Sequence, residues 1–292
     1  SRDSALKTIA WNKISIDVPV SWEIESLEKN HLIICEDQTP KLEVKWSVPK
    51  RKKSAENYLK QFVSHTQNNL GIAIRESERP AGFEAPDHSQ DFLFFSWHSD
   101  SGNGNGCIVY CHRCGRLTML RFFTSSFKDP SIIRDTIASF KDHTDKSRIF
   151  WSLFGMDFFT PKDSRLLSYD FKPGALNLSF KTGRITFTLY SWGPANFLLS
   201  KTSLDRFAGE RLKLEMQYTQ NGTENRGDFF LWEYQSGLTP YIHKLPILGG
   251  LSQYSLFRIT HDTNQNRILG VFIQSPYKFE RNLMMRLMIG ER

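Results

Sequence analysis

Residues 184–192, Arg-Ile-Thr-Phe-Thr-Leu-Tyr-Ser-Trp, alternate polar and apolar side chains and end on a tryptophan. Residues 41–46, Lys-Leu-Glu-Val-Lys-Trp, alternate in the same way and also end on a tryptophan. A period of two is typical of a strand that buries one face. The two stretches therefore predict equivalent strands in two copies of one folding unit, with a period of about half the chain.

The segments on either side of these two strands correspond as well. Residues 14–19, Ile-Ser-Ile-Asp-Val-Pro, and residues 156–161, Met-Asp-Phe-Phe-Thr-Pro, both predict strands that end at a proline. Further strands are predicted before each tryptophan, and a helix, a strand and a second helix after it. The segments predicted after the tryptophans are 54–63, 116–123 and 129–140 in the first copy and 197–207, 267–273 and 281–288 in the second.

This order of elements predicts an α+β fold made of two tandem repeats. Each repeat is expected to be an antiparallel β-sheet covered by helices, because amphipathic helices bury their apolar stripe against a sheet face. The predicted domains are residues 1–146, which hold all four cysteines, and residues 147–292, which carry most of the excess positive charge.

The arrangement resembles the PsbP-like fold, on the strength of Ile16-Asp17-Val18-Pro19 with Trp22, the strands ending at Trp46 and Trp192, and the closing segments of both copies. That family includes an extrinsic subunit of the photosynthetic oxygen-evolving complex and a nuclear-import factor that binds the Ran GTPase. The resemblance implies a PsbP-like sandwich and a mostly non-enzymatic adaptor that binds proteins. It carries over no functional residue, because no family motif for one is present.

Composition and charge exclude several classes of protein. Hydrophobic residues make up 39% and charged residues 24% of the chain, which excludes a mainly disordered or collagen-like protein. No apolar run reaches the ~18 residues of a membrane-spanning helix. The net charge of +7 is accompanied by no specific nucleic-acid recognition motif.

Cysteine usage favours a reducing compartment, and we expect a cytoplasmic protein. Disulfide scaffolds spread cysteines through a small chain, whereas here all of them lie in the first half. Residues 1–4, Ser-Arg-Asp-Ser, show no secretory signal. The chain begins without methionine, so an upstream segment is expected to have been removed.

The sharpest chemical signal is Cys111-His112-Arg113-Cys114-Gly115, a turn that can present two thiolates to one metal ion. Structural zinc needs four ligands, and the sequence contains no second Cys-x-x-Cys pair. Cys107 and Cys35 are therefore candidate zinc ligands beside Cys111 and Cys114. His112 and His98 are alternative ligands, and a redox disulfide or unligated thiols remain open.

The glycine-rich run at residues 101–106, Ser-Gly-Asn-Gly-Asn-Gly, lacks the Lys-Ser/Thr ending and the following helix of a phosphate loop. A run rich in glycine and asparagine favours a turn, so we expect a flexible hairpin loop here.

These observations leave three hypotheses about function. The first is a non-enzymatic protein-binding or scaffold protein, which the resemblance implies and the absence of a readable catalytic set supports. The second is a zinc- or redox-dependent protein centred on Cys107, Cys111 and Cys114. The third is an enzyme with a site in a cleft between the two copies, since domain junctions often hold ligand pockets.

Overall fold

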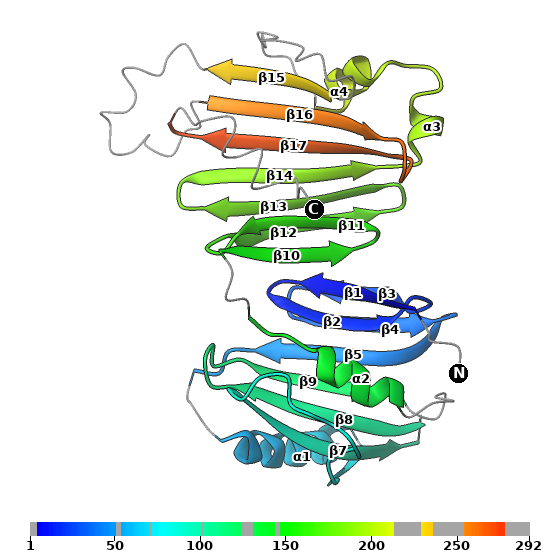
Figure 1. The fold of residues 1–292 in the computed structure, drawn as a ribbon, viewed down its shortest axis with the longest axis vertical. Helices are drawn as coiled ribbons and strands as arrows, with labels where there is room; N and C mark the ends of the chain where they lie inside the picture. The colour runs from blue at the N-terminus through cyan, green and yellow to red at the C-terminus, as the bar shows by residue number, and fades with distance from the viewer. Residues whose placement is uncertain are drawn as a thin grey trace. The chain divides into compact units, whose positions relative to one another are not determined.

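The computed structural model describes residues 5–50, 54–70, 72–100, 102–123, 131–143, 147–212, 229–235 and 254–277. These residues form seventeen strands in three antiparallel sheets and four helices (Figure 1). The chain divides into two compact units, Ser1–Phe158 and Phe159–Arg292. The sequence-based domain boundary after residue 146 stays a prediction.

The prediction of an α+β, PsbP-like sandwich with sheets covered by helices is wrong, because the described residues are mostly β-strand and their helices are few and short. Several strands lie in segments without a clear alternation, such as β7 (Gln90–Ser99). The helix predicted over residues 197–207 is two short pieces, α3 (Ala195–Leu198) and α4 (Leu204–Leu212). The helix predicted at residues 281–288 lies outside the described residues.

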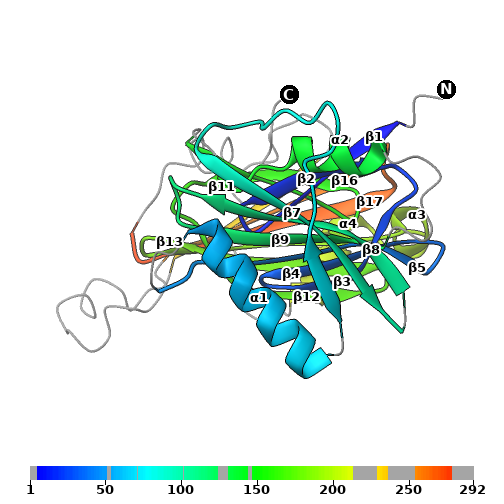
Figure 2. The ribbon, with the colours of Figure 1, turned by 90° about the horizontal axis from the view of Figure 1, so that it is seen from below.

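The first unit contains a seven-stranded sheet with the order β3-β4-β5-β9-β8-β7-β6. Helix α1 (Ala55–Leu70) packs on β6, β7 and β8, and Figure 2 shows it lying across the strands. Helix α2 (Ser131–Ser139) packs on β2. The sheet's strands are β3 (Glu23–Glu28), β4 (His31–Glu36), β5 (Thr39–Ser47), β6 (Ala73–Glu76), β7, β8 (Gly102–Cys111) and β9 (Leu117–Phe122).

A four-stranded sheet has the order β11-β10-β1-β2. Its hairpins turn through pairs of residues with positive φ, as at Asn12 (φ 44°) and Lys13 (φ 76°). Two-residue turns of this kind match the twist of the strands they join. The strands are β1 (Leu6–Trp11), β2 (Ile14–Pro19), β10 (Arg148–Leu153) and β11 (Met156–Pro161).

The second unit contains a six-stranded sheet with the order β12-β13-β14-β17-β16-β15. Its connectivity repeats that of the first unit, because β14 pairs with β17 as β5 pairs with β9. The predicted equivalence of the strands ending at Trp46 and Trp192 agrees with this order. The strands are β12 (Arg165–Lys172), β13 (Ala175–Thr182), β14 (Ile185–Trp192), β15 (Phe229–Gln235), β16 (Tyr254–Asp262) and β17 (Arg267–Ser275).

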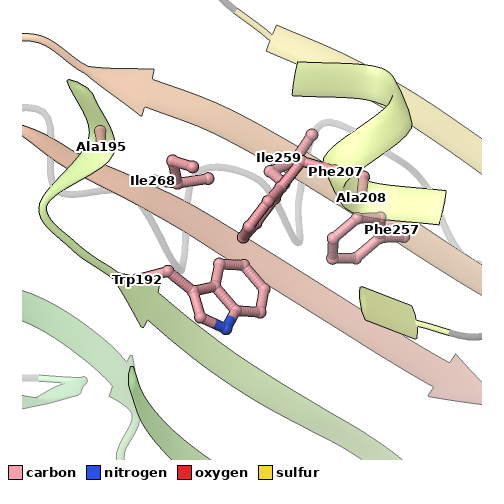
Figure 3. Close-up of a cluster of buried hydrophobic side chains, with 7 residues drawn as sticks. All are labelled: Trp192, Ala195, Phe207, Ala208, Phe257, Ile259 and Ile268. Atoms are coloured by element: carbon pink, nitrogen blue, oxygen red, sulfur yellow. The ribbon is translucent and has the colours of Figure 1, made fainter. Parts of the chain in front are cut away.

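One hydrophobic core cluster of the second unit lies between α4 and the strands β14, β16 and β17 (Figure 3). Phe207 of α4 meets Trp192 edge to face, with ring centroids 5.5 Å apart. Phe257 and Ile268 of the neighbouring strands are fully buried in the same cluster. The aromatic content therefore serves packing here, in the edge-to-face geometry that ring quadrupoles favour.

The hairpin-loop prediction for residues 101–106 is wrong for residues 102–106, because residues 102–111 form strand β8 and pair with β7 over their whole length, while residue 101 lies outside the described residues. The glycines are needed because aromatic rings and backbone lie against them. A Cβ on Gly106 would lie 2.2 Å from the ring of Phe95, and one on Gly104 only 1.8 Å from the carbonyl oxygen of Phe122. These residues therefore belong to an interior strand, although their glycine-rich composition is typical of a loop.

Glu43 of β5 is a buried carboxylate held by three cationic or protonatable groups. It lies 2.8 Å from Lys45 Nζ, 2.6 Å from an Arg121 guanidinium nitrogen and 3.0 Å from His31 Nε2. Burial alone raises the pKa of this carboxyl, but the ion pairs outweigh burial and hold the pKa below its usual range. Arg121 also stacks 5.1 Å from the ring centroid of Trp97.

We expect the substitution Glu43→Gln to lower stability by about 1–3 kcal/mol at neutral pH, because the cations around it lose their counter-charge. A carboxyl whose pKa is lowered by folding stabilises the fold above its unfolded pKa of about 4.3, and this contribution disappears as pH falls through the folded value. The difference between wild type and variant in urea unfolding should therefore shrink from pH 6 towards pH 3. A difference that does not depend on pH would contradict the ion-pair explanation.

Candidate metal centre

Two segments of the first unit bring four potential metal ligands together. Cys111 and Cys114 lie at the end of β8 and in the turn that leads to β9, while Asp142 and His143 follow α2. One ligand atom from each side chain lies within 4.8 Å of the corresponding atom of every other member. The structure therefore adds a carboxylate and an imidazole to the Cys-x-x-Cys pair.

Local backbone geometry fixes the two cysteines. The N–H of Gly115 donates to the carbonyl of Cys111 at 2.8 Å, which closes the turn, and Gly115 itself adopts φ +68°. This left-handed conformation is readily open to glycine, which explains the glycine after the second cysteine. The N–H of Cys111 donates to the carbonyl of Arg116 at 2.9 Å and ties the two strands together.

The other two members are positioned by the segment that follows α2. The backbones of Lys141 and Ser15 exchange two hydrogen bonds, of 2.8 and 2.9 Å, so the segment is anchored on β2. Arg116 then donates to the carbonyl of Asp142, and Gln90 Nε2 donates to Asp142 Oδ1 at 2.9 Å. The carboxylate of Asp142 is thereby oriented before any ion is present.

Two of the distances between these ligand atoms match those of a tetrahedral zinc ion. His143 Nδ1 lies 3.5 Å from Cys111 Sγ, and Cys114 Sγ lies 3.5 Å from Asp142 Oδ2. With zinc–sulfur bonds of about 2.3 Å and zinc–nitrogen or zinc–oxygen bonds of about 2.0 Å, a tetrahedron separates such ligand atoms by about 3.5 Å. His143 Nδ1 and Asp142 Oδ1 are 2.7 Å apart, a hydrogen-bond distance, so these two side chains would move apart by roughly 0.5 Å to bind the ion together.

His143 also has the outer partner that a metal-bound imidazole requires. Its Nδ1 faces the cluster, and its Nε2 lies 3.4 Å from Asp87 Oδ2. Hydrogen bonds from Ser89 lower the pKa of Asp87 and keep it an anion. At 3.4 Å this contact is an ion pair, and it places the carboxylate where metal-bound histidines commonly have the acceptor of their second ring N–H.

Without a bound cation, the surroundings of Cys114 disfavour the thiolate form, which is the form that binds a metal ion. Burial and the neighbouring Asp142 carboxylate raise the pKa of Cys114 to about 12. A divalent ion reverses this effect, because it stabilises the thiolate directly. Cys111 is fully buried and Asp142 is 1% exposed, whereas Cys114 and His143 are half-buried.

The structure separates the other cysteines and histidines proposed as ligands from this cluster. Cys107 is fully buried, and burial raises its pKa far above the ordinary value. Cys35 lies in β4, and His98 is an exposed residue of β7. His112 pairs with Asp91 at 2.8 Å. Among the described residues, the cluster contains Cys111 and Cys114 of the predicted set and none of these four side chains.

Asp142 and His143 were missed by sequence reasoning. They lie 28 and 32 residues from the cysteines that they contact, and no spacing rule links the two segments. Their only signal in the sequence is an adjacent acid and histidine directly after a predicted helix. The fold brings them to the cysteines because α2 returns the chain to the seven-stranded sheet.

No protein-family model matches the chain, and no curated protein matches its sequence. The resemblance to PsbP-like proteins therefore has no support from these comparisons. Among the described residues no helix is long and apolar enough to cross a membrane. The hypothesis of an enzyme with a site between the two copies stays a prediction.

Proposed function

We propose that this chain is a non-enzymatic binding or scaffold protein whose first unit is held together by one structural zinc ion. The observation that carries this proposal is the cluster of Cys111, Cys114, Asp142 and His143. Two sulfur ligands favour zinc over magnesium or calcium, which prefer oxygen ligands. The zinc would be bound by all four side chains and would supply a cross-link.

A structural role follows from the number of ligands. Catalytic zinc keeps one coordination position for water or substrate, whereas structural zinc has four protein ligands. Here four side chains are available, and Cys111 and Asp142 are buried. The ion would fasten the segment after α2 to the β8–β9 turn of the large sheet, and so tie α2, which packs on β2, to that sheet. This supports a stable platform for a protein partner more than it supports a reaction.

The test is the metal content of the full chain, purified without a metal-affinity step and then equilibrated with zinc. We expect about one zinc per chain and loss of reactivity at two of the four thiols. Replacement by cobalt(II) should give the visible absorption of a tetrahedral, thiolate-bound ion. Metal-free protein with four titratable thiols after exposure to zinc would overturn the proposal, and a Cys111–Cys114 disulfide would support the redox hypothesis instead.

A further inference from the structure

A second candidate site lies on the face of the seven-stranded sheet that α1 partly covers. Residues of β9 alternate between two environments: Thr118, Leu120 and Phe122 are fully buried on one face, whereas Leu117 and Met119 are only half-buried on the other. The half-buried side chains border a pocket of about 560 Å³. This volume lies within the ~300–1,000 Å³ that is typical of small-molecule sites.

The floor of this pocket changes from polar to apolar along one row across the sheet. Strand register places His31 opposite Lys45, Lys45 opposite Met119, and Met119 opposite Ile108. Residues that face one another across neighbouring strands share a sheet face. The row therefore begins with two nitrogen-bearing side chains on β4 and β5 and ends with two apolar ones on β9 and β8.

Helix α1 covers the apolar end of the row. Phe62 packs against the cluster that contains Ile108, and its ring centroid lies 5.8 Å from that of Phe95. Tyr58 packs beside Leu117 and lies 5.9 Å from Tyr110, measured between ring centroids. The end with Lys45 remains accessible, since the side chain of Lys45 is 53% exposed. A long apolar group can thus lie under the helix while a polar head stays at the mouth.

The charged side chains at the accessible end of the pocket, beside Lys45, favour a ligand with an anionic head group. Lys45 and Arg121 both pair with the single carboxylate of Glu43, which leaves one positive charge in excess. Glu28 and Lys29, which also border the pocket, offset each other. Lys29 and Lys45 both border the pocket and reach solvent, and Lys45 is the one that lies beside the apolar residue Met119 in the row. A negatively charged head group at this point would have a partner, whereas a cationic one would be repelled.

We propose that this pocket binds an amphipathic carboxylate of the fatty-acid class. The apolar chain lies on Ile108, Leu117 and Met119 beneath α1, and the carboxylate pairs with Lys45. The site is separate from the metal centre, and its ligand is recognised without zinc. Protein from which zinc has been removed by a chelator but which stays folded is therefore expected to bind the same ligand.

Calorimetric titration of the full chain with dodecanoate, dodecanol and dodecylammonium tests this inference. We expect dodecanoate to bind more tightly than either of the other two, by between about two- and fivefold, the range of a partly exposed ion pair. Equal binding of all three molecules, or binding of none, would overturn the proposal.

Two variants locate the binding. Lys45→Met should remove the preference for the carboxylate and leave dodecanol binding unchanged, and Met119→Trp should fill the pocket and abolish both. Lys60→Met, an exposed α1 residue outside the pocket lining, is the matched control and should behave as wild type. Circular dichroism reports whether each variant is folded. Dodecanoate binding that is unchanged in both folded pocket variants would show that the ligand binds elsewhere and would reject the site.

Discussion

Cys111→Ser is expected to abolish the stabilisation that zinc confers on this protein. An ion that binds only the folded chain stabilises it by about 4 kcal/mol when free zinc exceeds the dissociation constant by about 1,000-fold. Because Cys111 is a buried member of the cluster, its loss should reduce zinc from about one per chain to none. The measurement is the change in Tm between chelated and zinc-saturated protein, which cancels the intrinsic cost of each substitution.

The matched controls are Cys107→Ala and Cys35→Ala, which remove buried cysteines outside the cluster. Both variants should keep the zinc-dependent rise in Tm, even where their metal-free Tm is lower. If Cys111→Ser does not fold, His143→Gln makes the same test at a side chain that is 19% exposed. An equal zinc-dependent rise in all variants would show that the ion binds away from these ligands.

Gly104→Ala should be the most damaging replacement of a glycine by alanine in the described part of the chain. Its new Cβ would lie 1.8 Å from the carbonyl oxygen of Phe122 and 2.7 Å from Trp97 Nε1. Those two atoms share a hydrogen bond of 3.0 Å across the sheet. Backbone displacement and the loss of this buried bond are expected to cost about 3 kcal/mol or more in urea unfolding.

Gly209→Ala is the control, and its expected change in stability has the opposite sign. Gly209 lies inside α4, and a Cβ there would meet nothing within 4 Å. Alanine is favoured over glycine in a helix interior by roughly 0.5–1 kcal/mol, so this variant should be slightly more stable than wild type. If both variants had wild-type stability, close packing against Gly104 would be the wrong explanation for the glycine in β8.

Alternating strands were the part of the fold that the sequence predicted well. Residues 14–19 and 156–161 form β2 and β11, with the bounds that the proline-ended patterns indicated. These strands have one buried and one partly exposed face, and so they carry the period of two. The first half of strand β8 did not show this alternation. It has glycine at the positions where a larger side chain would collide with neighbouring aromatic rings and backbone.

The fold class was predicted wrongly because helical periodicity was given too much weight. The apolar residues between 197 and 207 have helical spacing, yet they belong to two short helices and an intervening turn. Phe197, the first residue of that predicted segment, is 75% exposed. A short amphipathic pattern does not indicate how many residues the helix contains. The length of a helix decides how much of a sheet face it can cover.

Half of the candidate site was accessible to sequence reasoning, and half was not. Cys111 and Cys114 lie three residues apart, so their spacing alone indicated that they can share one ion, with a redox disulfide or unligated thiols as the alternatives. Asp142 and His143 join them through tertiary structure, after the chain has passed through β9 and α2. Adjacent acid–histidine pairs occur elsewhere in this chain, and nothing local distinguishes the pair that the fold brings to the cysteines.

The central pairing of the large sheet also affects how the protein is made. β5 finds its neighbour β9 only after about 70 further residues have been synthesised, as the pairing of Ser47 with Leu117 shows. At about 5–20 residues per second, β5 therefore waits several seconds on the ribosome with one open hydrogen-bonding edge. The same delay recurs in the second half, where β14 awaits β17. Each half of the chain thus passes through an interval in which a nascent sheet is vulnerable to pairing with another chain.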